Sequence, residues 1–324
     1  MFLKDLINKG AETVSTMYPE REAREMVFAF LEHHLGTRRH THIVEPGYEV
    51  SEEDACKAVS AFERMASGEP LQYVTGKADF YGRDFHVSPS VLIPRPETEL
   101  LCRMALDAAA ERSDAKCSNG PLPLCGPLPL AGGGKMPFPH NRPPERQINI
   151  LDLCTGSGCI AWTLALECPE AEVTAVDISD GALEVAANQN FTEEMERTGA
   201  KAPVFCKADV LAGPEAFCRA DRKYDLILSN PPYVMDKEKA LMRTNVLEHE
   251  PHLALFVSDD DPLVFYRAVA GWASALLSSD GTGIVEINEA LGPETAQVFL
   301  DAGFLSAKIV KDLSERDRFV VFSR

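Results

Sequence analysis

Residues 148–161 read Ile-Asn-Ile-Leu-Asp-Leu-Cys-Thr-Gly-Ser-Gly-Cys-Ile-Ala, and this stretch decides the fold. Its apolar first half predicts a buried parallel strand. A glycine-rich turn follows, and an apolar helix is predicted over 158–167. Glycines in such a turn let the backbone approach a ligand closely, in front of a helix N-terminus. The stretch therefore predicts a strand–turn–helix unit that binds a ligand.

The alternation of strands and helices continues to the end of the chain. Strands are predicted at 148–154, 173–178, 204–208, 224–229, 283–287, 306–312 and 318–322, and helices at 158–167, 181–190, 263–277 and 293–302. This alternation predicts a doubly wound parallel sheet. Only residues 313–317 join the last two strands, which is too short for a parallel crossover. We therefore predict an α/β fold with a seven-stranded sheet whose last strand is antiparallel.

The rest of the chain predicts a second, smaller domain. Residues 1–76 show apolar spacing typical of helices and no strand signal, so we expect an all-helical N-terminal domain. Aromatic and β-branched residues at 77–95 predict a β-hairpin linker, and 96–324 form the main α/β domain. The Pro/Gly-rich tract at 113–144 predicts a flexible insertion, because it cannot bury enough apolar surface to become ordered.

Composition narrows the class of protein. The 324 residues are 45% hydrophobic and 25% charged, as in soluble globular proteins. The net charge of −18 argues against tight, sequence-independent binding to nucleic acid. The sequence predicts no signal peptide or membrane span. Nine scattered cysteines without a Cys-x-x-Cys pair predict reduced thiols in the cytoplasm. Four histidines at 33–42 lack partners at ligand-like spacing, so no metal site is expected.

A second motif, Asn230-Pro-Pro-Tyr233, follows the predicted strand at 224–229. The two prolines end the strand. Asn230 then projects from the carboxyl end of a central strand, where open α/β sheets bind ligands. Its side-chain oxygen and a main-chain carbonyl can accept two N–H hydrogen bonds, and Tyr233 offers an aromatic face. The motif predicts a site for a planar nitrogen nucleophile; a proline-rich strand exit with a capping Asn is the structural alternative.

Acidic residues at three strand ends predict a nucleoside cofactor. Asp177 suits the two hydroxyls of a ribose, and Asp209 and Val210 are placed to meet an adenine. The glycine turn with an acid about 20 residues on also satisfies the NAD fingerprint. Three features favour S-adenosylmethionine over a dinucleotide. Asp152 would lie near a sulfonium or amino group, the last strand is reversed, and the Asn230 motif offers a site that holds a nitrogen. The predicted cofactor residues are Asp152, Cys154, Thr155, Gly156, Ser157, Gly158, Asp177, Ile178, Asp209, Val210 and Asn230.

With two further motifs, Glu69-Pro-Leu-Gln-Tyr-Val-Thr-Gly76 and Ile93-Pro-Arg-Pro-Glu-Thr-Glu99, nearly the whole chain resembles the release-factor glutamine N5-methyltransferases, which are class I S-adenosylmethionine-dependent enzymes. The resemblance implies methyl transfer to the amide nitrogen of the Gln in the Gly-Gly-Gln loop of class I peptide-chain release factors. It also implies that 1–76 recognise the substrate and that 96–324 are the methyltransferase domain. The chain departs from the family at Cys154, where Gly is common, and at Asn288-Glu289.

The resemblance also assigns roles to residues. Asn230, Pro231, Pro232 and Tyr233 are the expected catalytic residues: Asn230 holds the amide, the prolines fix the loop and Tyr233 packs on the substrate. Arg95, Glu97 and Thr98 are expected to border the substrate pocket. One alternative is an adenine N6-methyltransferase acting on DNA or RNA, because an exocyclic amine has the same two N–H bonds; the net charge counts against it. A dinucleotide oxidoreductase and a non-catalytic ligand sensor are more distant alternatives.

Overall fold

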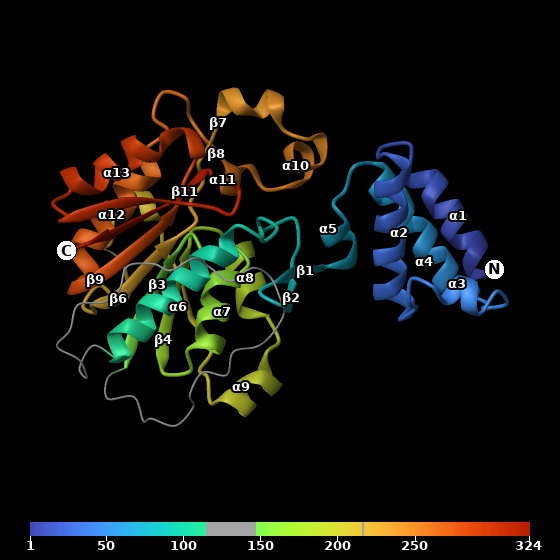
Figure 1. Ribbon diagram of the computed structural model, residues 1–324, viewed down its shortest axis with the longest axis horizontal. Coiled ribbons are helices and arrows are strands. Elements are labelled where there is room, and N and C mark those ends of the chain that lie inside the picture. The colour runs from blue at the N-terminus through green and yellow to red at the C-terminus, as the bar shows by residue number, and fades with distance from the viewer. Residues whose placement is uncertain (115–146, 216) are drawn as a thin grey trace.

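The computed structural model describes residues 1–114, 147–215 and 217–324, and it consists of a helical part, a hairpin and an α/β part (Figure 1). The predicted insertion at 113–144 lies outside the described residues, apart from the two residues that end helix α6. Within the described residues, no helix is both long enough and apolar enough to cross a bilayer.

The N-terminal part is a bundle of helices. They are α1 (Leu3–Val14), α2 (Glu20–Leu35), α3 (Thr41–Val44), α4 (Glu52–Ala66) and α5 (Leu71–Thr75). Ser51 caps α4, because its hydroxyl accepts the N–H of Asp54 at 3.0 Å. The apolar faces of α1, α2 and α4 meet in one core that includes Leu6, Val27 and Phe62. This bundle agrees with the all-helical N-terminal part predicted from the sequence.

A short hairpin joins the bundle to the sheet. Strands β1 (Lys77–Phe80) and β2 (Arg83–His86) pair antiparallel. The guanidinium of Arg83 is fixed on the α/β part by ion pairs with Glu167 at 2.5 Å and Glu194 at 2.7 Å. The hairpin is therefore anchored by charge as well as by packing.

The seven-stranded sheet has the order β10-β11-β9-β6-β3-β4-β5. Its strands are β3 (Ile148–Leu153), β4 (Ala171–Asp177), β5 (Val204–Lys207), β6 (Tyr224–Ser229), β9 (Leu277–Glu286), β10 (Ser306–Lys311) and β11 (Asp317–Ser323). Strand β11 runs antiparallel to both neighbours, and the remaining pairs are parallel. The predicted fold, with its reversed last strand, is confirmed. Strand β9 begins at Leu277 and not at 283, because the buried Leu277 pairs with Tyr224 of β6 before an irregularity, and regular pairing resumes at Thr282.

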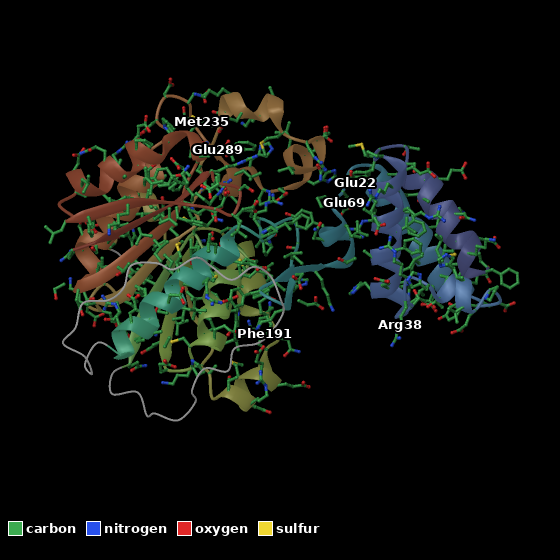
Figure 2. All side chains as sticks on the ribbon, viewed as in Figure 1. Glu22, Arg38, Glu69, Phe191, Met235 and Glu289 are labelled. Atoms are coloured by element: carbon green, nitrogen blue, oxygen red, sulfur yellow. The ribbon has the colours of Figure 1, made fainter. Side chains whose placement is uncertain are left out.

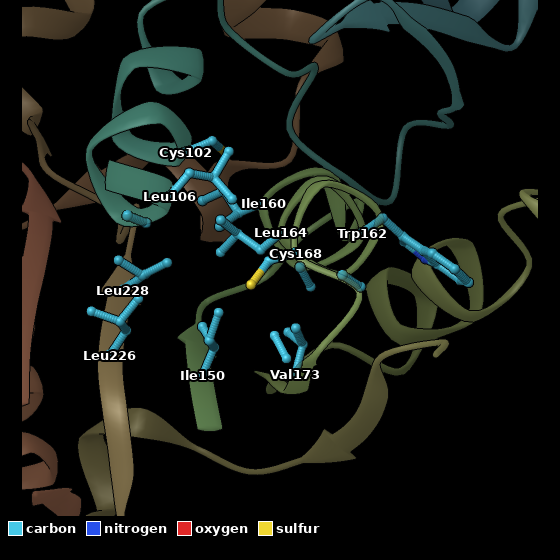
Figure 3. Packing of buried hydrophobic residues seen from close by; sticks show 14 of the residues in the cluster. Cys102, Leu106, Ile150, Ile160, Trp162, Leu164, Cys168, Val173, Leu226 and Leu228 are labelled. Atoms are coloured by element: carbon cyan, nitrogen blue, oxygen red, sulfur yellow. The ribbon is translucent and has the colours of Figure 1, made fainter. Parts of the chain in front are cut away.

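Helices cover both faces of the sheet. They are α6 (Thr98–Asp114), α7 (Cys159–Glu167) and α8 (Asp180–Ala187), followed later by α12 (Val264–Leu276) and α13 (Gly292–Asp301), with α9 (Thr192–Thr198) below α7. Figure 3 shows Leu106 and Leu164 packing over Ile150 and Leu226 on one face. Helices α12 and α13 pack on the opposite face. Alternate residues of each central strand are buried on alternate faces, as a doubly wound sheet requires.

A segment that the sequence did not predict follows β6. It contains β7 (Val234–Met235), η2 (Asp236–Leu241), α10 (Thr244–His249), α11 (His252–Leu255) and β8 (Phe256–Val257). Its Arg243 forms an ion pair with Glu22 of the helical bundle at 3.2 Å. Figure 2 shows Glu22 and Glu69 on the side of the bundle that faces the rest of the molecule. The segment therefore connects the end of β6 with the N-terminal helices.

Candidate functional site

The predicted glycine turn has the backbone conformation that its sequence requires. Cys154, Gly156 and Gly158 have φ values of 62°, 55° and 78°, all in the left-handed region that favours glycine. A Cβ atom on Gly158 would lie 3.0 Å from Cβ of Ala186, whereas one on Gly156 would have no atom within 4 Å. The absence of a side chain at Gly158 thus permits α8 to pack closely against the turn. The absence of a side chain at Gly156 leaves one side of the turn open for a ligand. Cys154 is a non-glycine residue in this left-handed conformation.

Asp152 lies at the end of β3 and is completely buried. Its Oδ2 accepts a hydrogen bond from Oγ1 of Thr155 at 2.6 Å, while within the described residues its Oδ1 has no hydrogen-bond partner. Burial raises the pKa of Asp152 to about 7, against the opposing effect of Thr155. A buried carboxylate oxygen without a partner is costly, and a bound cation or N–H group satisfies it.

Asp177 connects the end of β4 to the glycine turn. Its two carboxylate oxygens accept the backbone N–H groups of Gly156 and Ser179, both at 2.9 Å. Burial raises its pKa, whereas these hydrogen bonds oppose the shift. Each oxygen retains a further lone pair, so the carboxylate can still accept hydroxyl groups. The adjacent side chain of Ile178 is 43% exposed and offers an apolar surface at the same edge.

The end of β5 contributes Asp209 and Val210. Oδ1 of Asp209 accepts the N–H of Leu211 at 2.9 Å and begins the short helix η1 (Val210–Ala212). The Val210 side chain is buried in the core, and its carbonyl accepts a hydrogen bond from Nε1 of Trp272 at 3.0 Å. Asp209 therefore lies beyond the carboxyl end of β5, whereas the carbonyl of Val210 is hydrogen-bonded to α12.

Asn230 follows β6 and is held by a chain of side-chain hydrogen bonds. Its Nδ2 donates to Oγ1 of Thr98 at 3.1 Å, and that hydroxyl donates to Oε2 of Glu286 at 2.7 Å. Because a hydroxyl has only one proton, the bond to Glu286 makes Thr98 an acceptor for Asn230. In the described part of the chain no donor bonds to Oδ1 of Asn230. The side-chain oxygen is thus oriented and available.

Glu286 is also bound by the aromatic residue of the motif. The Tyr233 hydroxyl donates to Oε1 of Glu286 at 3.0 Å. Burial raises the pKa of Glu286, and the hydrogen bonds from Thr98 and Tyr233 favour its charged form. The Tyr233 carbonyl accepts a hydrogen bond from Nδ2 of Asn288 at 3.1 Å. Asn288 therefore fixes the backbone after the two prolines.

The structure places the three predicted pocket residues in different surroundings. Thr98 is buried against Asn230 and Glu286, as described above. Arg95 donates to Oε1 of the buried Glu250 at 2.6 Å, and Oε2 of Glu250 accepts the N–H of Ile93 at 3.2 Å. Glu97 is exposed. Glu250 thus joins the loop before α6 to the segment after β6.

Sequence reasoning missed Glu250 and Glu286. Glu286 ends β9, which pairs in parallel with β6 so that Ser229 lies opposite Val285. The next residues, Asn230 and Glu286, must therefore lie at the same edge of the sheet. An acid at the end of a predicted strand was a usable signal. No comparable signal marks Glu250, because it lies outside the regular alternation.

Comparison with known proteins shows which sequences this chain resembles. Residues 5–76 match the model of the PrmC N-terminal domain, and residues 138–254 match the methyltransferase small domain. The release factor glutamine methyltransferase of Flavobacterium psychrophilum is 30% identical over 320 residues, covering 99% of this chain and 98% of that protein. The protein of that name from Bacteroides thetaiotaomicron is 36% identical over 261 residues, covering 81% and 78%.

A solved structure, the release factor-specific protein-(glutamine-N5) methyltransferase of Alicyclobacillus acidocaldarius, is 26% identical to this chain. The match covers 74% of this chain and 99% of that chain, with a TM-score of 0.37.

Proposed function

Because this chain belongs to the release factor glutamine methyltransferase family, we propose that it transfers a methyl group from S-adenosylmethionine to the N5 amide nitrogen of the Gln in the Gly-Gly-Gln loop of class I peptide-chain release factors. The observation that carries the proposal is the orientation of Asn230. Its amide nitrogen is bound by Thr98, so its Oδ1 can accept an N–H of a substrate amide.

The residues of the glycine turn fit the cofactor. The unpartnered Oδ1 of buried Asp152 suits the positively charged amino group of S-adenosylmethionine. Asp177 suits the ribose hydroxyls, and the open side of Gly156 leaves room for close approach. Asp209 and Ile178 stand where an adenine would be held. When bound, the cofactor supplies an electrophilic methyl group on a sulfonium.

The chain's own residues overcome the weak nucleophilicity of an amide. The nitrogen lone pair is delocalised, so the substrate must be held with both N–H bonds directed at acceptors. Oδ1 of Asn230 and a main-chain carbonyl take these bonds, and the lone pair is then directed at the methyl group. The same acceptors stabilise positive charge that develops on nitrogen. The nitrogen loses its proton after it gains the methyl group, and no residue is assigned as a general base.

Thr98 and Glu286 act as positioning residues in this proposal. Glu286 fixes the hydroxyl of Thr98, Thr98 fixes the amide of Asn230, and Tyr233 is held by the same carboxylate. Pro231 and Pro232 restrict the backbone between Asn230 and Tyr233. Preorganisation of this kind avoids reorganisation in the transition state.

The remaining parts of the chain complete the proposal. Residues 1–76 recognise the release factor, 77–95 link the two parts and 96–324 carry the chemistry. Arg95 and Glu97 border the substrate pocket, with Arg95 held by Glu250. In this proposal the reaction takes place in the cytoplasm. We expect neither nucleic acid nor a membrane as a binding partner.

The test is the intact mass of a purified class I release factor after incubation with this protein and S-adenosylmethionine. We expect a gain of about 14 Da, one methyl group in place of one hydrogen. A release factor with the loop Gln changed to Ala is the matched control and should gain nothing. No gain on the unchanged release factor, with cofactor binding confirmed separately, would overturn the substrate and favour amines of nucleic acid.

A further inference from the structure

Two cysteines meet beside the residues proposed for the cofactor. Cys206 lies in β5, and Cys218 follows η1; their sulfur atoms are 3.1 Å apart. Both are free thiols, Cys206 half-buried and Cys218 exposed. A disulfide bond needs about 2.05 Å between sulfurs, so the two thiols are about 1 Å from bonding distance. Solvent reaches Cys218 directly.

The segments that carry Cys206 and Cys218 are each held to the rest of the α/β part. Cys206 is paired with Val176 in the sheet. On the other side, Arg219 forms an ion pair with Glu172 of β4 at 3.3 Å. Phe217 packs its ring on Trp272 with centroids 5.1 Å apart. These contacts hold the two segments that carry Cys206 and Cys218 next to each other.

We propose that Cys206 and Cys218 form a reversible disulfide that weakens the binding of S-adenosylmethionine; the effect on binding rests on the function proposed above. The oxidant is a low-molecular-weight disulfide such as oxidised glutathione. The Cys218 thiolate attacks one of its sulfurs and releases one glutathione thiol. Cys206 then attacks the mixed disulfide and releases the second. Two protein thiols become one disulfide, one external disulfide becomes two thiols, and both protons pass to the leaving thiolates.

The order of these steps follows from exposure. Burial, and then the neighbouring thiol of Cys218, raise the pKa of Cys206 to about 11. Since the thiolate is the nucleophile, the exposed Cys218 meets the oxidant first. Cys206 then needs only to attack a sulfur that is already adjacent to it.

The disulfide would act on the cofactor site through packed residues. The ring of Phe217 lies against Trp272, and the indole N–H of Trp272 holds the Val210 carbonyl at 3.0 Å. Disulfide formation would draw Cys218 toward Cys206 and would therefore strain the packing of Phe217 on Trp272. Because Trp272 holds the Val210 carbonyl, the strain would reach Val210 and its neighbour Asp209. Displacements of about 1 Å in such positioning contacts have large effects on ligand geometry.

The experiment begins with the full chain, reduced and then treated with oxidised glutathione. Peptide mapping without reduction should show Cys206 linked to Cys218, and dithiothreitol should reverse the link. Calorimetry should show S-adenosylmethionine bound about fivefold or more weakly by the oxidised protein. The Cys218→Ser variant should lose both effects. Cys56→Ser, which removes an exposed thiol of the helical bundle, is the matched control and should keep both.

Three outcomes would overturn the inference. One is a map in which Cys218 carries only glutathione. Another is a link from Cys218 to Cys117 or Cys125. The third is a Cys206–Cys218 link with unchanged cofactor affinity. If the reduced protein does not bind S-adenosylmethionine at all, the proposed function fails, while the peptide map still decides whether the disulfide forms.

Discussion

Nδ2 of Asn230 lies 3.1 Å from Oγ1 of Thr98, although 132 residues separate them in the sequence. Thr98 begins α6 and Asn230 directly follows β6, so the contact joins a helix start to the end of a strand. Glu286 completes the arrangement from β9. Glu286 accepts the proton of Thr98, and the Thr98 hydroxyl must therefore accept the hydrogen bond from Asn230. The free Oδ1 of Asn230 is the product of this arrangement.

Replacing Asn230 by Ala should abolish methyl transfer without removing the cofactor site. We expect kcat to fall by about 100-fold or more, since this is the usual cost of one preorganised hydrogen-bonding group at a reacting centre. Single-turnover methylation and calorimetric titration with S-adenosylmethionine measure the two properties separately. An equal loss of cofactor affinity would assign Asn230 to the cofactor and not to the nucleophile.

Thr98→Val keeps the shape of the side chain and removes the hydroxyl. We expect kcat to fall about fivefold, because the variant loses the hydrogen bond that orients Asn230, and a neutral hydrogen bond of this kind contributes about 1 kcal/mol. Thr98→Ser retains the hydroxyl and should retain most of the activity. If Val and Ser variants have the same kcat, Thr98 does not position Asn230.

Cofactor binding should depend on pH through Asp152. Burial raises the pKa of this carboxyl to about 7, so the charged form that attracts an amino group predominates above that pH. Affinity should therefore fall as the pH is lowered through about 7, and binding of the cation should in turn lower the pKa. The check is the dissociation constant of S-adenosylmethionine measured across this range. Asp152→Asn should bind more weakly and show little dependence; an unchanged pH profile in that variant would remove Asp152 from the explanation.

Gly156 and Gly158 should respond differently to alanine. At Gly158 the new Cβ would be 3.0 Å from Cβ of Ala186 and φ is positive, so we expect the free energy of unfolding to fall by about 2–3 kcal/mol. At Gly156 only the backbone penalty applies, about 1 kcal/mol, but the methyl group would occupy the open side of the turn. Denaturant unfolding should rank Gly158→Ala as the less stable variant. Cofactor titration should show a loss for Gly156→Ala larger than its unfolding penalty explains.

Much of the fold followed from local patterns. Apolar runs of strand length alternating with helical spacing predicted the doubly wound sheet, and the short connection at 313–317 predicted the reversed β11. The strand ends were accurate where apolar burial ends with the strand, as at β6. The segment from β7 to β8 was not predicted, because its elements are too short to show a period. Its course is determined by contacts such as that of Glu250 with Arg95.

The sequence by itself predicted that Asp152, Asp177 and Asn230 lie at one edge of the sheet, because each stands at or directly after the end of an apolar run that reads as a buried parallel strand, and the structure places all three at those strand ends. The role of each of these residues stays a prediction. Tertiary structure alone decided that Thr98 and Glu286 orient Asn230, and that Cys206 and Cys218 meet. The physical reason is that hydrogen bonds and thiol contacts require atoms to approach within about 3 Å. Residues more than a hundred positions apart, such as Thr98 and Glu286, reach that distance only when helix and sheet have packed.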